Sequence, residues 1–299
     1  EVDMKTRKVF YLALFAFTYV SAFGLQPVKK GKSKVGVQPL QEQQVVKQHL
    51  YEGEDSVQDT ITHRCTWVQR KGLGPLEVPG KLTDRPEQLL RRVAYMASYN
   101  SDLRIPNWVA WQLTAEHTEG TNERKGISFQ EDKEVPKPRA VDADYVKSGY
   151  DRGHLCPSAD NSWDAIAQKQ SFLLTNICPQ DHKLNVGDWK ELESQCRKWA
   201  KKYGCIYIVA GPVMMKGEHK TIGKNKITVP EAFFKVVLCM EGEPKAIGFI
   251  YRNEGDNRPK SYYVKTIDDV ERITGIDFFP TLPNKIEDEV EAMSSLDDW

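Results

Sequence analysis

The chain has 299 residues, of which 40% are hydrophobic, so it can build a sizeable buried core in one large or two small domains. Lysine and arginine together number 42, and aspartate and glutamate also number 42, so the formal net charge is zero. With balanced charges, the molecule as a whole has no electrostatic field that attracts a polyanion. This counts against a high-affinity nucleic-acid binder, because such proteins are usually basic overall. The segment from Lys285 to the end contains six acidic residues and one lysine. The part that precedes it therefore carries a net positive charge of about five and can form a local basic groove.

The first 24 residues are typical of a secretory signal peptide. Lys5, Arg7 and Lys8 precede an apolar run over residues 9–20, and Ala22-Phe23-Gly24 supplies small residues at a cleavage position. The run is shorter than the roughly 20 residues of a membrane span, although an uncleaved anchor is the alternative. We therefore predict an exported protein, periplasmic or extracellular, without stable membrane association once the signal is cleaved.

Export would place the cysteines in an oxidising compartment, where disulfides persist. The cysteines are Cys65, Cys156, Cys178, Cys196, Cys205 and Cys239. An even number permits complete pairing, and Cys196 with Cys205 is the pair we favour because the two are close in sequence. Buried thiols are the alternative, since a core of this size needs no disulfide to be stable.

Residues 25–86 separate the signal from the compact part. Residues 25–60 are rich in lysine, glutamine and valine without a clear period, so we predict a flexible N-terminal linker or extension over 25–86. Residues 86–95 carry Leu89, Leu90 and Val93 at helical spacing, which predicts an amphipathic helix at the start of the domain.

The remaining elements follow from hydrophobic periodicity. Apolar runs predict buried strands over residues 108–111, 206–210, 233–238 and 246–251, the second of them ended by Gly211-Pro212. Trp189, Leu192, Cys196 and Trp199 recur at steps of three and four and predict a helix over residues 188–203. Strands and helices without regular alternation favour an α+β fold.

The stretch from Asp151 to Glu193 concentrates side chains that can carry chemistry. It holds Arg152, His154, Asn176, His182, Asn185 and Glu193. Hydrolysis of a phosphodiester needs a base for the attacking water, a positive group for the transition-state charge, and stabilisation of the leaving oxygen. A histidine suits the first task, an arginine the second, and a hard cation such as Mg²⁺, held by oxygen ligands, the third. The residues alone predict an acid–base and metal site and leave the substrate open.

Several ordered blocks carry a resemblance to a known family. They are Asp151-Arg152-Gly153-His154-Leu155-Cys156-Pro157, Thr175-Asn176-Ile177-Cys178-Pro179-Gln180, Leu184-Asn185 with Trp189 and Leu192-Glu193, and, further out, residues 106–111, 210–213 and 274–280. At these spacings the chain resembles the DNA/RNA non-specific endonuclease family of ββα-metal nucleases, which includes secreted bacterial nucleases and mitochondrial endonuclease G. The resemblance covers residues 87–293 and leaves 294–299 as an acidic tail. It implies a ββα-metal nuclease fold, with a central antiparallel sheet flanked by helices.

The resemblance also implies a role for each matching residue. His154 would be the general base, and Arg152 would stabilise the phosphate in the transition state. Asn185 would be the one direct protein ligand of Mg²⁺, for which Mn²⁺ can substitute, and Glu193 would hold the metal-bound waters as well as serve catalysis. Asn176 would help to position the substrate or the site.

A second arginine that contacts phosphate in this family has a looser match here. Arg124, followed by Phe129 and Asp132, is the best candidate for it. Taken together, the resemblance implies a magnesium-dependent endonuclease that cuts DNA and RNA without sequence preference. A homodimer is compatible with it, because relatives often dimerise.

Other functions are open to the same residues. His154, Cys156, Cys178 and His182 offer two histidines and two cysteines that could bind zinc tetrahedrally, which would make the chain a zinc-stabilised binding module. An inactive nuclease fold that still binds nucleic acid is a further alternative, although the intact set of catalytic residues argues against it. Cys156 and Cys178 depart from the family pattern, and they could instead form a disulfide between the two motif blocks or be small buried residues.

Overall fold

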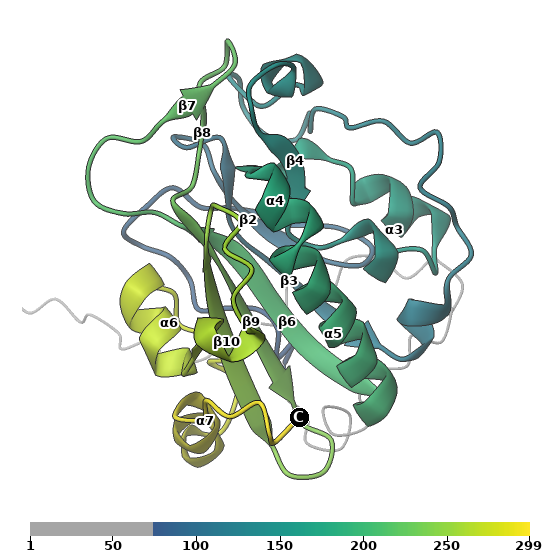
Figure 1. Ribbon diagram of the computed structural model, residues 1–299, viewed down its shortest axis with the longest axis vertical. Helices are drawn as coiled ribbons and strands as arrows, with labels where there is room; N and C mark the ends of the chain where they lie inside the picture. Colours follow the sequence, from purple (N-terminus) through teal and green to yellow (C-terminus); the bar gives the residue numbers. More distant parts are fainter. Residues whose placement is uncertain (1–73) are drawn as a thin grey trace, which may run out of the picture. The chain divides into compact units, whose positions relative to one another are not determined.

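The computed structural model describes residues 74–299, so the predicted signal peptide and the predicted linker up to residue 73 lie outside the described residues. At its centre is a seven-stranded antiparallel sheet with the strand order β1-β2-β3-β6-β9-β10-β11 (Figure 1). The strands are β1 (Gln88–Arg91), β2 (Met96–Asn100), β3 (Ile105–Thr114), β6 (Cys205–Val213), β9 (Ala232–Cys239), β10 (Lys245–Arg252) and β11 (Val264–Lys265). None of the helices within residues 74–299 is long and apolar enough to cross a membrane.

Helices cover both faces of this sheet, which explains why β6 and β9 are buried at every position. Successive strand residues point to opposite faces. Ile206 and Ile208 of β6 pack in one apolar cluster with helix α5 (Asp188–Tyr203). Tyr207 and Val209 pack in a second cluster with α6 (Ile267–Thr274) and α7 (Asn284–Glu291), on the other side of the sheet (Figure 1). The predicted α+β class, with an antiparallel sheet flanked by helices, is confirmed.

A smaller unit carries the motif blocks around His154 and Asn176 on the α5 side of the sheet. Strands β4 (Asp151–His154) and β5 (Ile177–Gln180) pair antiparallel, with His154 opposite Ile177. The chain then passes through the short helix α4 (His182–Val186) into α5, which gives the order strand, strand, helix. The remaining elements are η1 (Glu116–Glu119), η2 (Asp142–Tyr145), η3 (Ser158–Asp160), α3 (Ala165–Gln170), η4 (Leu174–Asn176), β7 (Thr221–Ile222), β8 (Ile227–Thr228) and η5 (Lys260–Tyr263).

The four predicted strands and the predicted helix are all present. Helix α5 occupies residues 188–203 as its periodicity predicts. Strand β6, however, continues through Gly211-Pro212 to Val213. Pairing with β3 extends only to Ala210, so Pro212 lies beyond the doubly paired part of β6, where a missing N–H is tolerated.

The predicted helix over residues 86–95 is wrong. Strands β1 and β2 form an antiparallel hairpin there, with Leu90 opposite Ala97. Leu90 is 2% exposed, whereas Leu89 and Val93 are 55% and 50% exposed, so the burial alternates as in a strand. Over so short a window three apolar residues fit either period, and pairing with β2 decides between them.

The predicted linker ends before the boundary at residue 86. Leu76 and Leu82 are buried in the cluster that includes α6 and α7. The backbone N–H of Gly80 donates to the carbonyl oxygen of Asp277 at 2.8 Å. The apolar contacts of residues 76–82 make this segment part of the folded domain.

The predicted acidic tail, residues 294–299, also belongs to the packed domain. The ring of Trp299 lies 4.6 Å from that of Trp199 and 6.0 Å from that of Tyr203, both on α5. Leu296 packs against the same apolar cluster. The apolar members of the tail therefore outweigh its charge and anchor it at the end of α5.

The cysteine pairings predicted from the sequence are wrong. Cys205 is disulfide-bonded, whereas Cys196 is a free, buried thiol. Cys196 belongs to the apolar cluster on the α5 face and Cys205 to the cluster on the opposite face, so the sheet separates them. Cys156 and Cys178 are likewise free and buried, which leaves the alternative of small buried residues.

Candidate active site

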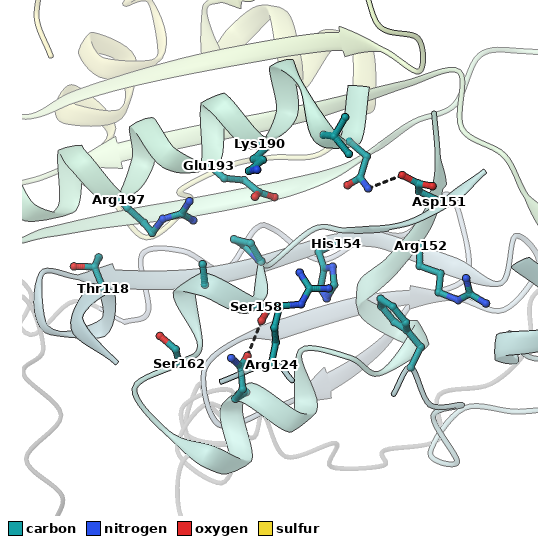
Figure 2. Close-up of a pocket in the computed structure, with 16 residues that line it drawn as sticks. Thr118, Arg124, Asp151, Arg152, His154, Ser158, Ser162, Lys190, Glu193 and Arg197 are labelled. Carbon is teal, nitrogen blue, oxygen red and sulfur yellow. Dashed lines mark hydrogen bonds between the residues drawn. The ribbon is translucent and has the colours of Figure 1, made fainter. Parts of the chain in front are cut away.

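A cleft of about 760 Å³ lies between β4, the end of α4 and one face of α5 (Figure 2). The predicted site residues that line it are Arg124, Arg152, His154, Asn185 and Glu193. Residues that are far apart in the sequence therefore meet in one cavity. Asn176 is absent from its lining.

His154 ends strand β4, and helix α5 holds it in place. Trp189 Nε1 on α5 donates a hydrogen bond to the backbone oxygen of His154 at 3.1 Å. The imidazole ring lies 5.3 Å from the ring of Phe129 and 5.1 Å from that of Phe172. Its Nε2 is buried and has no hydrogen-bond partner in the described part of the chain. Burial, with the positive charge of Arg124 as a second cause, lowers the pKa of His154 to about 3, so the ring is neutral at neutral pH.

Asn176 fixes the backbone that follows His154. Its Oδ1 accepts from the N–H of Cys156 at 2.9 Å, and its Nδ2 donates to the carbonyl oxygens of Cys156 and Ser171, both at 2.8 Å. Asn176 is 0% exposed and does not line the cleft, so its contacts hold the backbone beneath the site. Gly153 is required next to His154, because a Cβ there would clash with the side chain of Gln180.

Asn185 presents an oxygen to the cleft because its amide nitrogen is already engaged. Its Nδ2 donates to Oδ2 of Asp151 at 2.9 Å, at the beginning of β4. The same carboxylate oxygen contacts Nδ1 of His182 at 2.8 Å. The hydrogen bond to Asp151 orients the amide so that Oδ1 is the atom left to bind a hard cation.

Glu193 lies on α5, and its carboxylate is turned into the cleft on the side of His154 (Figure 2). Burial raises the pKa of Glu193 to about 7, with the charge of Lys235 opposing the shift. A bound cation would favour the ionised carboxylate again. One amide oxygen and one carboxylate in a water-accessible cleft suit a hard cation such as Mg²⁺, which keeps several of its waters and needs few protein ligands.

The two predicted arginines have different surroundings. The guanidinium of Arg152 donates to Asp142, with Nε 2.6 Å from Oδ1, and is turned away from His154 (Figure 2). It also lies 5.6 Å from the ring centre of Phe129. Arg124 reaches the middle of the cleft beside His154 (Figure 2). The looser match in the sequence is thus the arginine nearer to the proposed base.

Sequence reasoning missed two basic residues of the cleft, Lys190 and Arg197. They stand three residues before and four residues after Glu193, on the same face of α5. Arg197 Nη1 donates to Oδ1 of the buried Asp160 at 2.9 Å. Once residues 188–203 were predicted as a helix and Glu193 was assigned to the site, this spacing could have identified both.

The zinc site that we gave as the alternative is wrong. His154, Cys156, Cys178 and His182 do not come together as a metal-binding group within residues 74–299. Cys178 is paired with Gly153, so it faces the side of the β4–β5 ribbon opposite to His154. The side chain of His182 is 70% exposed and contacts Asp151 instead.

Comparisons with known proteins place the chain in a family. The model of the DNA/RNA non-specific endonuclease family matches residues 46–285. The mitochondrial nuclease EXOG of Xenopus laevis is 32% identical over 206 residues, covering 64% of this chain and 58% of that protein. Mitochondrial endonuclease G of Homo sapiens is 32% identical (65% of this chain, 70% of that protein), and a nuclease of Nostoc sp. is 33% identical (72% and 81%).

A solved structure has the same fold. The crystal structure of the EndoG/EndoGI complex matches with a TM-score of 0.65 and 26% identity, over 70% of this chain and 90% of that chain. This likeness confirms the predicted ββα-metal nuclease fold. The chain spans less than two thirds of the length of the EXOG nucleases it matches, 58% in the Xenopus protein.

Proposed function

Because the chain belongs to the family of DNA/RNA non-specific endonucleases, we propose that it hydrolyses phosphodiester bonds within DNA and RNA without sequence preference, and that it requires Mg²⁺ or Mn²⁺. One observation carries the proposal: a single cleft joins the neutral His154, the oriented amide of Asn185 and the carboxylate of Glu193. An inactive nucleic-acid-binding module would have no need of this combination.

His154 acts as the general base in this proposal. The ring is neutral, and its position is set by the hydrogen bond from Trp189 to its backbone and by the contacts with Phe129 and Phe172. A water in the cleft within hydrogen-bond distance of the ring loses its proton to the ring while its oxygen bonds to phosphorus. The P–O bond to one of the two nucleosides breaks, and the leaving oxygen takes up a proton from solvent. The fixed ring lowers the entropic cost of aligning base, water and phosphate.

Basic side chains receive the phosphate. Arg124 lies beside His154, and Lys190 and Arg197 add positive charge from α5. Such contacts depend on the backbone of the nucleic acid and carry no base information, which accounts for cleavage without sequence preference. The neutral overall charge is compatible with this binding, because the positive groups are gathered in the cleft.

Asn185 and Glu193 would hold the metal ion, Asn185 directly through Oδ1 and Glu193 through waters. When bound, the ion supplies positive charge that stabilises the oxygens of the reacting phosphate. Asp151 contributes by keeping the amide of Asn185 in the orientation that exposes its oxygen.

Removal of the metal tests this part of the proposal. We expect EDTA to stop cleavage of plasmid DNA and of RNA, and added Mg²⁺ to restore it. Asn185→Ala should raise the Mg²⁺ concentration required for half-maximal rate by about 10- to 100-fold, because the direct ligand is lost. His182→Ala is the matched control, since it removes the other contact of Asp151 but no ligand. Cleavage that persists in EDTA would contradict the metal requirement.

The positions of the two arginines predict unequal roles. Arg124→Ala should lower the initial cleavage rate by about 10²-fold, because it removes a positive donor beside the reacting phosphate. Arg152→Ala should have a smaller effect on the rate, since its guanidinium is held by Asp142, and should mainly lower the melting temperature. The measurements are the initial rate of plasmid nicking and the melting temperature of each variant, which separate a catalytic role from a structural one. The reverse order of rate losses would show that Arg152 leaves Asp142 to bind substrate.

A further inference from the structure

A group of three carboxylates lies on the side of the sheet opposite to the cleft. Asp268 and Glu271 belong to α6, and Glu291 ends α7. One carboxylate oxygen of each lies within 4.8 Å of those of the other two. Figure 1 shows α6 and α7 on the other side of the sheet from α5. The group is the only one of its kind within residues 74–299, and the proposed nuclease reaction does not use it.

Glu291 is the member that needs a ligand. It is only 9% exposed, and its Oε1 is buried without a hydrogen-bond partner among the described residues. Leaving a buried carboxylate oxygen unpaired is costly, and native structures normally satisfy such atoms. Glu271 differs, because its Oε1 accepts from the backbone N–H of Phe278 at 2.6 Å.

The surroundings of Glu291 add negative charge. The groups with the largest electrostatic effect on it are Glu271, Glu287, Asp268 and Asp277. Burial and this repulsion raise the pKa of Glu291 to about 8, and burial raises that of Glu271 to about 7. The repulsion between carboxylates held together in this way is relieved either by bound protons or by a bound cation.

We propose that Asp268, Glu271 and Glu291 bind a divalent cation, with Ca²⁺ as the best match, and that this ion fastens α7 to α6. Ca²⁺ binds carboxylate oxygens at about 2.3–2.6 Å, so two oxygens on opposite sides of it are up to about 5 Å apart. The separation of the three oxygens falls within this span. Mg²⁺ binds at about 2.0–2.1 Å and demands regular octahedral geometry, so it fits a spread and partly exposed group less well.

Binding would stabilise the folded chain. A ligand that binds only the folded state raises the ratio of folded to unfolded protein by the factor 1 + [Ca²⁺]/Kd, which is about 11-fold at ten times Kd. The helix that benefits is α7, which brings Val290 into the buried cluster shared with α6. The site is therefore structural and independent of the metal of the cleft.

Calcium binding to the full chain tests the proposal. The titrations use CaCl₂ and isothermal calorimetry on the Asn185→Ala protein, so that the ligand in the cleft is absent. We expect this protein to retain one Ca²⁺ per chain. Adding Asp268→Asn should weaken binding at least about tenfold, because one of three charged ligands is lost. Asp269→Asn is the matched control: it removes the same charge from the same turn, but Asp269 pairs with Arg272 at 2.7 Å.

Stability and activity give a second measurement. In the Asn185→Ala protein, CaCl₂ should raise the melting temperature with or without Asp269→Asn, but not when Asp268→Asn or Glu291→Gln is added. Glu291→Gln should retain the Mg²⁺-dependent cleavage of the wild type. If Glu291→Gln fails to fold, the exposed Asp268 decides the question.

Two results would overturn the proposal. One is a chain without Asn185 that binds no Ca²⁺, or binds it equally with Asp268→Asn and Asp269→Asn. The other is a pH dependence of stability that CaCl₂ does not change, which would mean that the carboxylates share protons and bind no cation. The folded-state pKa values of about 7 and about 8 lie above the ordinary value of 4.5, so their stabilising contribution is complete below about pH 4.5 and is lost as the pH rises through about 7–8. The same loss of stability in CaCl₂ as in EDTA would mean that protons neutralise the group.

Discussion

Replacing His154 by alanine should lower the rate of DNA and RNA cleavage by about 10²- to 10⁴-fold, which is the usual contribution of a general base. The variant loses the only imidazole that lines the described cleft. The oxygens of Asn185 and Glu193 that we propose bind the metal stay where they are, because Asp151 and helix α5 hold them independently of the ring. The loss should therefore appear in kcat, with metal binding retained.

The measurement is the steady-state rate on plasmid and on RNA, together with circular dichroism, thermal melting and metal titration of the same preparation. His117→Ala is the control: His117 is also a partly buried histidine, stacked on Trp163 at 4.3 Å, but it does not line the cleft. A His154→Ala protein that keeps more than about a tenth of the wild-type rate would mean that another group removes the proton.

Replacing Trp189 by alanine should lower the free energy of unfolding by about 3–5 kcal/mol, the range for a large aromatic residue removed from a core. Trp189 is 0% exposed and packs 5.6 Å from the ring of Phe233 and 6.1 Å from that of Tyr251. The buried Lys235 lies over its ring, with Nζ 4.4 Å from the ring centre. The substitution therefore leaves a cavity beside a charge that has lost part of its favourable contact.

Urea denaturation measures this loss, and the rate of cleavage measures its effect on the site. Trp189→Phe keeps most of the apolar volume but removes the Nε1 donor to the backbone of His154, so it should cost less stability and still reduce the rate. Trp163→Ala, at a half-buried position, is the matched control. A loss below about 1 kcal/mol for Trp189→Ala would show that the core can collapse around the gap.

Several residues of the cleft were predictable, because they stand in short blocks with local structure of their own. His154 follows a glycine that β4 requires, and Glu193 lies on α5, whose periodicity is visible in the sequence; Asn185 lies on the short helix α4 that precedes α5. The sequence did not indicate which arginine is nearer to the base. Arg124 and Arg152 belong to distant segments, and only packing against Phe129 and Phe172 and the ion pair with Asp142 separates them.

The boundaries of the domain were less predictable for a related reason. Leu76 and Trp299 belong to segments without a period. Leu76 is buried, and Trp299 is partly buried, only because the sheet and α5 offer apolar surface to them. The helix predicted over residues 86–95, where the hairpin of β1 and β2 forms, depended on only three apolar residues. So few residues fit both the period of a helix and that of a strand, and pairing between the two strands decides for the strand.

By itself the sequence determined the α+β class, the central strands and helix α5, because each depends on spacing along one segment. It also predicted residues that the structure places together in the cleft. Only the tertiary structure decided which side chains meet. It separated Cys196 from Cys205 by the thickness of a sheet, turned His154 and Cys178 to opposite faces of one ribbon, and brought Glu291 to Asp268 and Glu271. Contacts between distant segments are set by how the faces of the sheet are covered, and no local pattern records that choice.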